Sequence, residues 1–285
     1  MPTVIRRTFF KVFTMMVLCF VILCSQNVMA QKSVSIVVSQ DNWGEARTVD
    51  IQKVLESAAN ELWVYFPNKR LETIKVVYDA DTPRTRCAKG SNGEYIVQLT
   101  AQNRRWAQFS YQFAHEFFHV LSNYDKTGCN SGIGTENQWF EESLAEVSSM
   151  FVLRQMAATW KENPPYSNWK SYASSLEKYG EDLRNDTNRQ LPPNTKFIKW
   201  FKENHSSLRN DPYLRAKNKL IANRLLPFFE RSPESWEAIG YFNLGTPDSS
   251  NSFQAYLNNW HKKVPVKYES FVENIAKEFG MRITN

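Results

Sequence analysis

Two histidines and a glutamate lie within five residues of one another in the stretch FAHEFFHVLSNY (113–124). On an α-helix, His115 and His119 project from the same face, so their imidazoles can converge on one ion. Glu116 follows the first histidine, where its carboxylate can reach a water molecule on that ion. This is the H-E-x-x-H pattern, in which the histidines hold zinc and the glutamate acts as a general base. The pattern predicts one Zn²⁺ ion per chain.

The alternative for these histidines is a role in the core. Histidines on an apolar helix are often satisfied by neighbouring side chains, and a five-residue pattern can arise by chance. The chain has only four histidines, however, and two of them occur here with the glutamate in place. The apolar residues around them suit a helix buried beneath an active site. We therefore favour the metal site.

A catalytic zinc site takes three protein ligands and keeps one position open. The stretch NQWFEESLAEVSSMF (137–151) offers Glu141, Glu142 and Glu146 in a helical context. Glu142 and Glu146 share a helix face, whereas Glu141 points about 100° away. One carboxylate of the pair can bind zinc while the other orients a ligating imidazole. A solvated acidic face near a helix start is the alternative, because the helix dipole favours it.

Together these elements resemble the gluzincin-type zinc metallopeptidases (M1-like, peptidase MA-like), in which H-E-x-x-H is followed by a glutamate ligand on the next helix. The segment WFEESLA (139–145) is similar to W-L-N-E-G-F-A of the M1-type branch, and this resemblance makes Glu142 the third metal ligand. In the thermolysin-like branch an acid four residues later bonds a zinc histidine, and Glu146 occupies that place. The resemblance implies a zincin-like catalytic domain with a peptide or protein substrate.

A further resemblance concerns the stretch DPYLRAKNKLIANRLLPFF (211–229), which is similar to the P-Y-E-K-G helix of M1-type enzymes. That helix supplies a tyrosine that stabilises the oxyanion, so Tyr213 is expected in this role. An ordinary packed tyrosine is the alternative, because the glycine after the lysine is missing. His205 and His261 are other candidate donors. No G-x-M-E-N segment precedes the motif, so we predict no aminopeptidase; strand 94–100 is instead expected to be an edge that pairs with an extended peptide.

The elements that must position these residues fall into two halves. Short runs rich in β-branched residues predict strands at 33–38, 73–79 and 94–100, with a helix at 49–65. Beyond residue 103, helical spacing of apolar residues predicts helices near 103–124, 137–160, 167–184, 195–205, 211–230, 252–262 and 268–279. Strands followed by helices predict an α+β fold, a small N-terminal sheet and then a mainly helical part. We expect a single catalytic domain at 31–285, with the strands and the zinc helix in 31–125 and the helical part in 126–285.

The first thirty residues do not belong to that domain. Arg6, Arg7 and Lys11 precede an apolar run at 12–24, and Ala30 ends the segment. This order is typical of a secretory signal peptide. The run is shorter than the ~20 residues that span a bilayer, so removal is favoured over a retained membrane anchor. We expect cleavage after Ala30 and a secreted or periplasmic protein.

Charge and cysteine content narrow the choice of partners. Loss of residues 1–30 removes three positive charges and no negative ones, so the net charge of +6 falls to +3. That charge is too small to indicate a nucleic-acid partner. Cys87 and Cys129 remain, and an even pair in an exported protein predicts a disulfide, with two separate buried thiols as the alternative.

These features predict an exported zinc-dependent peptidase. His115, His119 and Glu142 would bind zinc, and Glu116 would take a proton from the attacking water and pass it to the leaving amine. Two alternatives stay open: a non-catalytic zinc-stabilised binding protein, and a zinc hydrolase of a non-peptide amide. The motif describes attack by activated water and does not name the bond that is cut.

Overall fold

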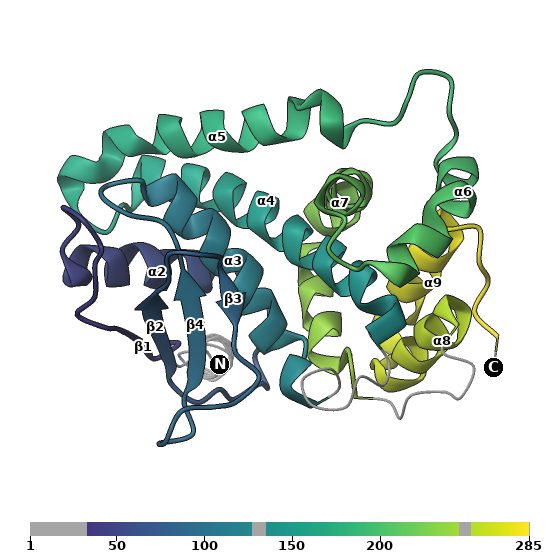
Figure 1. The fold of residues 1–285 in the computed structure, drawn as a ribbon, viewed down its shortest axis with the longest axis horizontal. Coiled ribbons are helices and arrows are strands. Elements are labelled where there is room, and N and C mark those ends of the chain that lie inside the picture. The colour runs from purple at the N-terminus through teal and green to yellow at the C-terminus, as the bar shows by residue number, and fades with distance from the viewer. Residues whose placement is uncertain (1–32, 127–134, 245–251, 285) are drawn as a thin grey trace, which may run out of the picture. The chain divides into compact units, whose positions relative to one another are not determined.

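The computed structural model describes residues 33–126, 135–244 and 252–284. A sheet in the order β1–β2–β4–β3 lies in the N-terminal half (Figure 1), and its strands are β1 (Ile36–Val38), β2 (Ile74–Tyr78), β3 (Arg84–Thr85) and β4 (Tyr95–Leu99). Strands β1, β2 and β4 are parallel, and β3 runs antiparallel to β4. The predicted α+β class with a small N-terminal sheet is therefore confirmed.

One face of this sheet lies in the core. Along β2, Ile74 and Val76 are fully buried and Lys75 between them is exposed, as expected for side chains that alternate between two faces. Helix α2 (Thr48–Trp63) packs against β1, and α3 (Trp106–Leu121) packs against β4 and β3. Helix α3 carries His115 and His119, and its packing against the sheet holds both residues in place.

The helical half matches the periodicity of the sequence. Its α-helices are α4 (Gln138–Glu162), α5 (Ala173–Asn185), α6 (Phe197–Asn210), α7 (Arg215–Arg231), α8 (Phe253–Lys263) and α9 (Glu269–Glu278). The described residues also include short 3-10 helices, which are η1 (Tyr124–Lys126), η2 (Thr135–Asn137), η3 (Ser167–Tyr172), η4 (Thr187–Arg189), η5 (Pro233–Tyr241) and η6 (Val266–Tyr268). Each predicted helix has a counterpart, whereas η5 was not predicted.

Helix α4 is the central element of this half. It is apolar on several faces and packs against α3, α5 and α7, as is typical of a helix surrounded by others (Figure 1). At its N-terminal end Trp139 and Phe140 contact Phe253 of α8 and Phe279 just beyond α9, with ring centroids 4.7–5.9 Å apart. These rings anchor the first turn of α4, which carries Glu141 and directly precedes Glu142.

The prediction that strand 94–100 forms an edge is wrong. Strand β4 lies between β2 and β3, so β3 is the edge strand on that side. Two residues, one of them arginine, give no run of β-branched residues, so the sequence did not reveal β3. The Arg84 and Arg86 side chains both donate to Gln98 Oε1 of β4 at 2.9 Å, and Arg86 N donates to Ile96 O at 2.9 Å.

Two sequence predictions fall outside the described residues. The signal peptide with its cleavage after Ala30 lies within residues 1–32, and Cys129 lies within 127–134. Cys87 is described, and its Sγ lies 3.7 Å from the Tyr124 hydroxyl. The Cys87–Cys129 disulfide therefore stays a prediction. In the ranges that are described, no helix is both long enough and apolar enough to cross a bilayer.

Candidate metal centre

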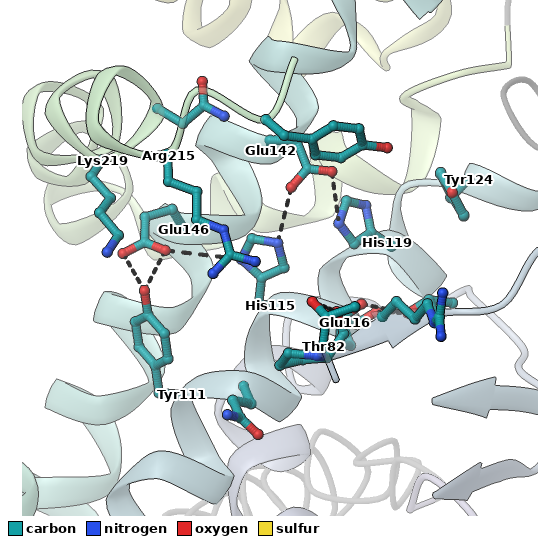
Figure 2. A pocket seen from close by; sticks show the side chains of 16 residues that line it. Thr82, Tyr111, His115, Glu116, His119, Tyr124, Glu142, Glu146, Arg215 and Lys219 are labelled. Atoms are coloured by element: carbon teal, nitrogen blue, oxygen red, sulfur yellow. Dashed lines mark hydrogen bonds and ion pairs between the residues drawn. The ribbon is translucent and has the colours of Figure 1, made fainter. Parts of the chain in front are cut away.

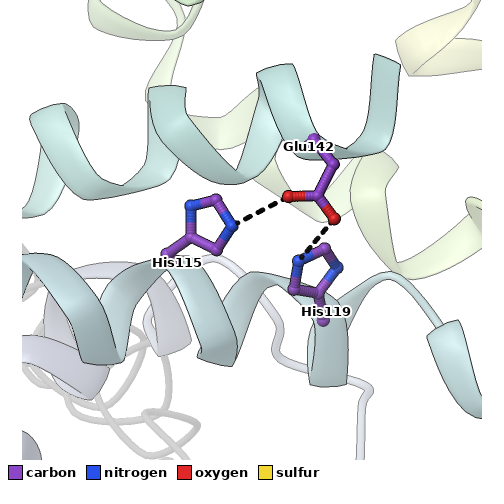
Figure 3. Close-up of side chains that lie close together, drawn as sticks. All are labelled: His115, His119 and Glu142. Carbon is purple, nitrogen blue, oxygen red and sulfur yellow. Dashed lines mark hydrogen bonds and ion pairs between the residues drawn. The ribbon is translucent and has the colours of Figure 1, made fainter. Parts of the chain in front are cut away.

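Helices α3 and α4 bring the three predicted ligands together. His115 and His119 extend from α3 toward Glu142 of α4, and the glutamate carboxylate lies between the two imidazoles (Figure 3). His115 Nε2 is 3.2 Å from Glu142 Oε2, and His119 Nε2 is 3.6 Å from Glu142 Oε1. One ligand atom from each residue lies within 4.8 Å of the others.

This donor set could hold a metal ion, and its chemistry is compatible with zinc. Two neutral imidazole nitrogens and one carboxylate oxygen are a common ligand set for catalytic zinc. A tetrahedral ion with bonds of about 2.0–2.2 Å separates its ligands by about 3.3–3.6 Å. The two nitrogen–oxygen distances of 3.2 and 3.6 Å are close to that range. These two distances are to different oxygens of Glu142, and the three ligand atoms lie within 4.8 Å of one another, so the side chains would have to adjust to bind an ion.

Glu141 holds His119 from the side opposite to Glu142. Its Oε1 lies 3.1 Å from His119 Nδ1 and accepts a hydrogen bond from Ser122 Oγ at 2.7 Å. Its Oε2 accepts from Asn243 Nδ2 at 3.0 Å. A carboxylate on Nδ1 fixes the tautomer that leaves Nε2 free for a metal. The sequence analysis placed Glu141 about 100° from the ligand face and gave it no role, so this contact was missed.

Glu146 lies on the His115 side of the site. Its Oε2 is 4.0 Å from His115 Nδ1, so the predicted partner is near but not in hydrogen-bond contact. The shorter contacts of this carboxylate are with the Tyr111 hydroxyl, which donates to it at 2.6 Å, and with the Arg189 guanidinium. Arg189 is 1% exposed, and nothing in the sequence indicated that it would be buried.

Glu116 lies below the two histidines, on the side of the sheet. It is 4% exposed, and its Oε2 accepts a hydrogen bond from Thr85 Oγ1 at 3.1 Å. The same hydroxyl lies 2.9 Å from the Glu116 main-chain carbonyl oxygen. Strand β3 is thereby connected to the predicted general base. Burial raises the pKa of the Glu116 carboxyl group above its ordinary value, although both histidines oppose this.

The charges of the site favour a cation between these side chains. Burial would lower the pKa of both histidines, but the surrounding carboxylates outweigh it and raise the pKa of His119 to about 9. Burial would raise the pKa of Glu142, yet His119 and His115 hold it below its ordinary value. Without a metal, the raised pKa of His119 favours the protonated imidazole at neutral pH. A divalent cation would displace that proton on binding.

The ligands lie in a cavity of about 490 Å³ (Figure 2). Its floor is formed by α3 and α4. One wall is the segment Thr82–Thr85, which includes β3, and the opposite wall is the start of α7. The lining residues there are Tyr213, Arg215, Asn218 and Lys219. The centre is therefore open to a ligand that fits between the edge strand and α7.

Tyr213 lines this cavity, as its predicted role requires. It is 59% exposed, and its hydroxyl accepts a hydrogen bond from Gln138 Nε2 at 2.9 Å. Tyr124 also lines the cavity, and its ring centroid lies 5.1 Å from that of His119. Neither His205 nor His261 is among the lining residues: the first packs against aromatic rings, and the second lies 3.6 Å from Glu273. Tyr124 is therefore a second candidate phenol that the sequence analysis missed.

Searches against protein-family models, curated proteins and solved structures found no match to this chain.

Proposed function

We propose that the protein is an exported zinc-dependent peptidase with a zincin-like catalytic domain of the gluzincin type. The observation that carries the proposal is the convergence of His115, His119 and Glu142 within 4.8 Å, beside the buried carboxylate of Glu116. Zinc held there would supply an activated water molecule and polarise the scissile carbonyl. Export rests on the signal-like order of residues 1–30.

In this proposal Glu116 moves the proton. Its carboxylate takes a proton from the attacking water and later gives it to the leaving amine. A raised pKa suits both steps, because the group must accept and release a proton near neutral pH. The hydrogen bond from Thr85 Oγ1 holds one carboxylate oxygen, which leaves the other for the water.

The peptide itself would lie along β3. In an antiparallel pair, alternate residues direct their main-chain groups toward the partner strand and away from it. Arg86 N bonds inward to Ile96 O, so the N–H and C=O of Thr85 face the open side. An extended substrate could pair with this edge and cross the cavity above Glu142. This support for a peptide substrate replaces the expectation that residues 94–100 form the edge.

Metal content is the first test. Wild-type protein should contain close to one zinc per chain by inductively coupled plasma mass spectrometry, and His119→Ala should lose it. His205→Ala is the matched control, because it removes a histidine outside the cavity and should keep the zinc. A wild-type protein that stays free of metal after reconstitution would refute the proposal.

Glu116→Gln separates catalysis from binding. The variant should keep its zinc and lose hydrolysis of a mixed peptide library by at least about a hundredfold, since general base catalysis typically contributes that much. A wild-type protein that contains zinc but hydrolyses nothing would favour the non-catalytic binding protein. Hydrolysis confined to non-peptide amides would favour the zinc hydrolase of a non-peptide amide. Full peptidase activity in Glu116→Gln would contradict the proton-transfer role.

A further inference from the structure

Two basic side chains on α7 face the metal centre. Arg215 and Lys219 are four residues apart on this helix, so they lie on the same face, and both line the cavity. Figure 2 shows the two side chains extending from α7 toward His115 and Glu146. They are the cations of the wall opposite β3, and the proposed function uses neither.

The carboxylates of the cavity are already engaged by other groups. Glu142 lies between the two histidines, and Glu116 accepts from Thr85. Glu146 is bound by the buried guanidinium of Arg189. Glu142 and Glu146 therefore have cationic partners, in the histidines or the expected metal and in Arg189, whereas the donor to Glu116 is neutral.

The cations of the two walls differ in whether they have an ion-pair partner. Arg84 of β3 is paired with Asp79 at 3.5 Å and donates to Gln98. In the part of the chain that the structure describes, neither Arg215 nor Lys219 forms an ion pair within 4.0 Å. The α7 wall thus carries two cations without a direct ion pair, although Arg215 is close enough to Glu142 to help lower the pKa of that carboxyl group. The positive N-terminal end of α7, which begins at Arg215, adds to these two cations.

We propose that Arg215 and Lys219 bind a carboxylate of the substrate, which makes this site selective for peptides that present a carboxylate beside α7. The inference rests on the proposed function, because it assumes that a peptide crosses the cavity. A peptide lying along β3 directs alternate side chains to either side, and one side faces α7. A carboxylate on the side that faces α7 could accept charge-assisted hydrogen bonds from both cations, and such bonds are stronger than those between neutral groups. The carboxylate can belong to a Glu or Asp side chain or to the peptide C-terminus.

Three peptides distinguish these sources. Acetyl-Ala-Ala-Glu-Ala-Ala-amide carries a side-chain carboxylate, acetyl-Ala-Ala-Gln-Ala-Ala with a free acid carries a terminal one, and the Gln peptide amide carries neither. Binding is measured by isothermal titration calorimetry on the full zinc-loaded protein with Glu116→Gln, so that no peptide is consumed. One or both carboxylate peptides should bind about tenfold more tightly than the neutral peptide.

Two charge-removing variants in the same background test the residues. Arg215→Gln with Lys219→Gln should abolish the preference, so that the three peptides bind with similar affinities. Arg231→Gln is the matched control, because it removes a cation of the same helix that does not line the cavity. This variant should keep the tenfold preference. Raising the salt from 50 to 500 mM should weaken the preference, since exposed charges are screened.

Several outcomes would overturn the inference. Equal binding of all three peptides would do so, and so would a preference that survives in the double variant. A preference that disappears only with His119→Ala would assign the carboxylate to the metal rather than to α7. Hydrolysis assays on the parent protein keep the two proposals apart: equal hydrolysis of all three peptides leaves the peptidase standing without selectivity for a carboxylate. Carboxylate binding without hydrolysis would leave the α7 site standing without the peptidase.

Discussion

The two histidines of the candidate metal centre are held differently, although they are one turn apart on α3. The His119 side chain is 6% exposed and lies 3.1 Å from Glu141, which is itself bound by Ser122 and Asn243. The His115 side chain is 21% exposed, and its nearest second carboxylate, Glu146, is 4.0 Å away. We infer that His119 is oriented before a metal binds, whereas His115 can adjust to it.

The reason for the difference lies in what each glutamate already binds. Glu141 has partners that leave Oε1 directed at His119. Glu146 is drawn away from His115 by Tyr111 and Arg189. An acidic residue near a ligand is therefore not sufficient to orient it, because its other partners decide where the carboxylate points.

The largest expected effect, on stability, comes from removing the ion pair between Arg189 and Glu146. Arg189→Ala would leave a buried carboxylate without its cation, and it should lower the free energy of unfolding by about 3–5 kcal/mol. Urea unfolding monitored by tryptophan fluorescence measures this. Lys161→Ala, which removes one member of an exposed ion pair with Glu177, is the control and should change stability by less than about 1 kcal/mol.

A second variant sharpens this result. Combining Arg189→Ala with Glu146→Gln removes the unpaired charge, so a good part of the lost stability should return. If the double variant is as unstable as Arg189→Ala alone, the arginine acts through packing rather than through Glu146.

Protonation of His119 should dominate the pH dependence of the stability of the metal-free protein. The pKa of His119 is raised to about 9 in the folded state from an ordinary value of 6.5, so protonation stabilises the fold. This contribution is complete below about pH 6.5 and is lost as the pH rises toward 9; it amounts to roughly 3 kcal/mol. Urea unfolding in excess chelator from pH 6 to 9 measures it. His119→Gln should flatten the profile, and an unchanged profile in that variant would contradict the assignment.

Zinc affinity compares the two glutamates directly. Glu141→Gln should weaken zinc binding about 10- to 100-fold, the usual effect of losing the carboxylate behind a histidine ligand. Glu146→Gln should have a smaller effect, because its carboxylate is 4.0 Å from His115. Competition with a chromophoric chelator gives both affinities. Equal losses would remove the distinction between the two sides.

The smallest effect is expected at Ser122. Ser122→Ala deletes the hydroxyl that donates to Glu141 Oε1 and should weaken zinc binding about threefold to tenfold. Ser148→Ala is the matched control, since its hydroxyl donates to Ala114 O between the same two helices and touches no ligand carboxylate. The control should lose stability and keep its zinc affinity; a loss of affinity there would indicate a general loosening of α3 against α4.

Local periodicity in the sequence was sufficient to predict much of this architecture. The spacing of His115 and His119 on one helix face, and the helices themselves, follow from patterns within single segments. Placing Glu142 required the resemblance to a known segment, because the contact joins two helices. The position of Glu141 on α4, about 100° from Glu142, was predicted correctly, but its contact with His119 was not. Helix α3 lies close enough for Glu141 and Glu142 to reach the two different ring nitrogens of His119.

Other features had no local signal at all. Arg189 is 43 residues from Glu146 in the chain, and no pattern in its surroundings marks an arginine as buried. Strand β3 consists of two residues in a basic stretch that has no run of β-branched residues. Pairing with β4 creates it, so only the tertiary structure identifies it as a strand.

The shortness of β3 has a consequence for solubility. Exposed strand edges are places where a second copy of a chain can add itself and begin an aggregate. Here the edge is two residues long, and Pro83 before it has no N–H to offer an incoming strand. A newly synthesised chain at high local concentration thus meets an edge that can accept a transient peptide but cannot support an extended β-ladder between copies.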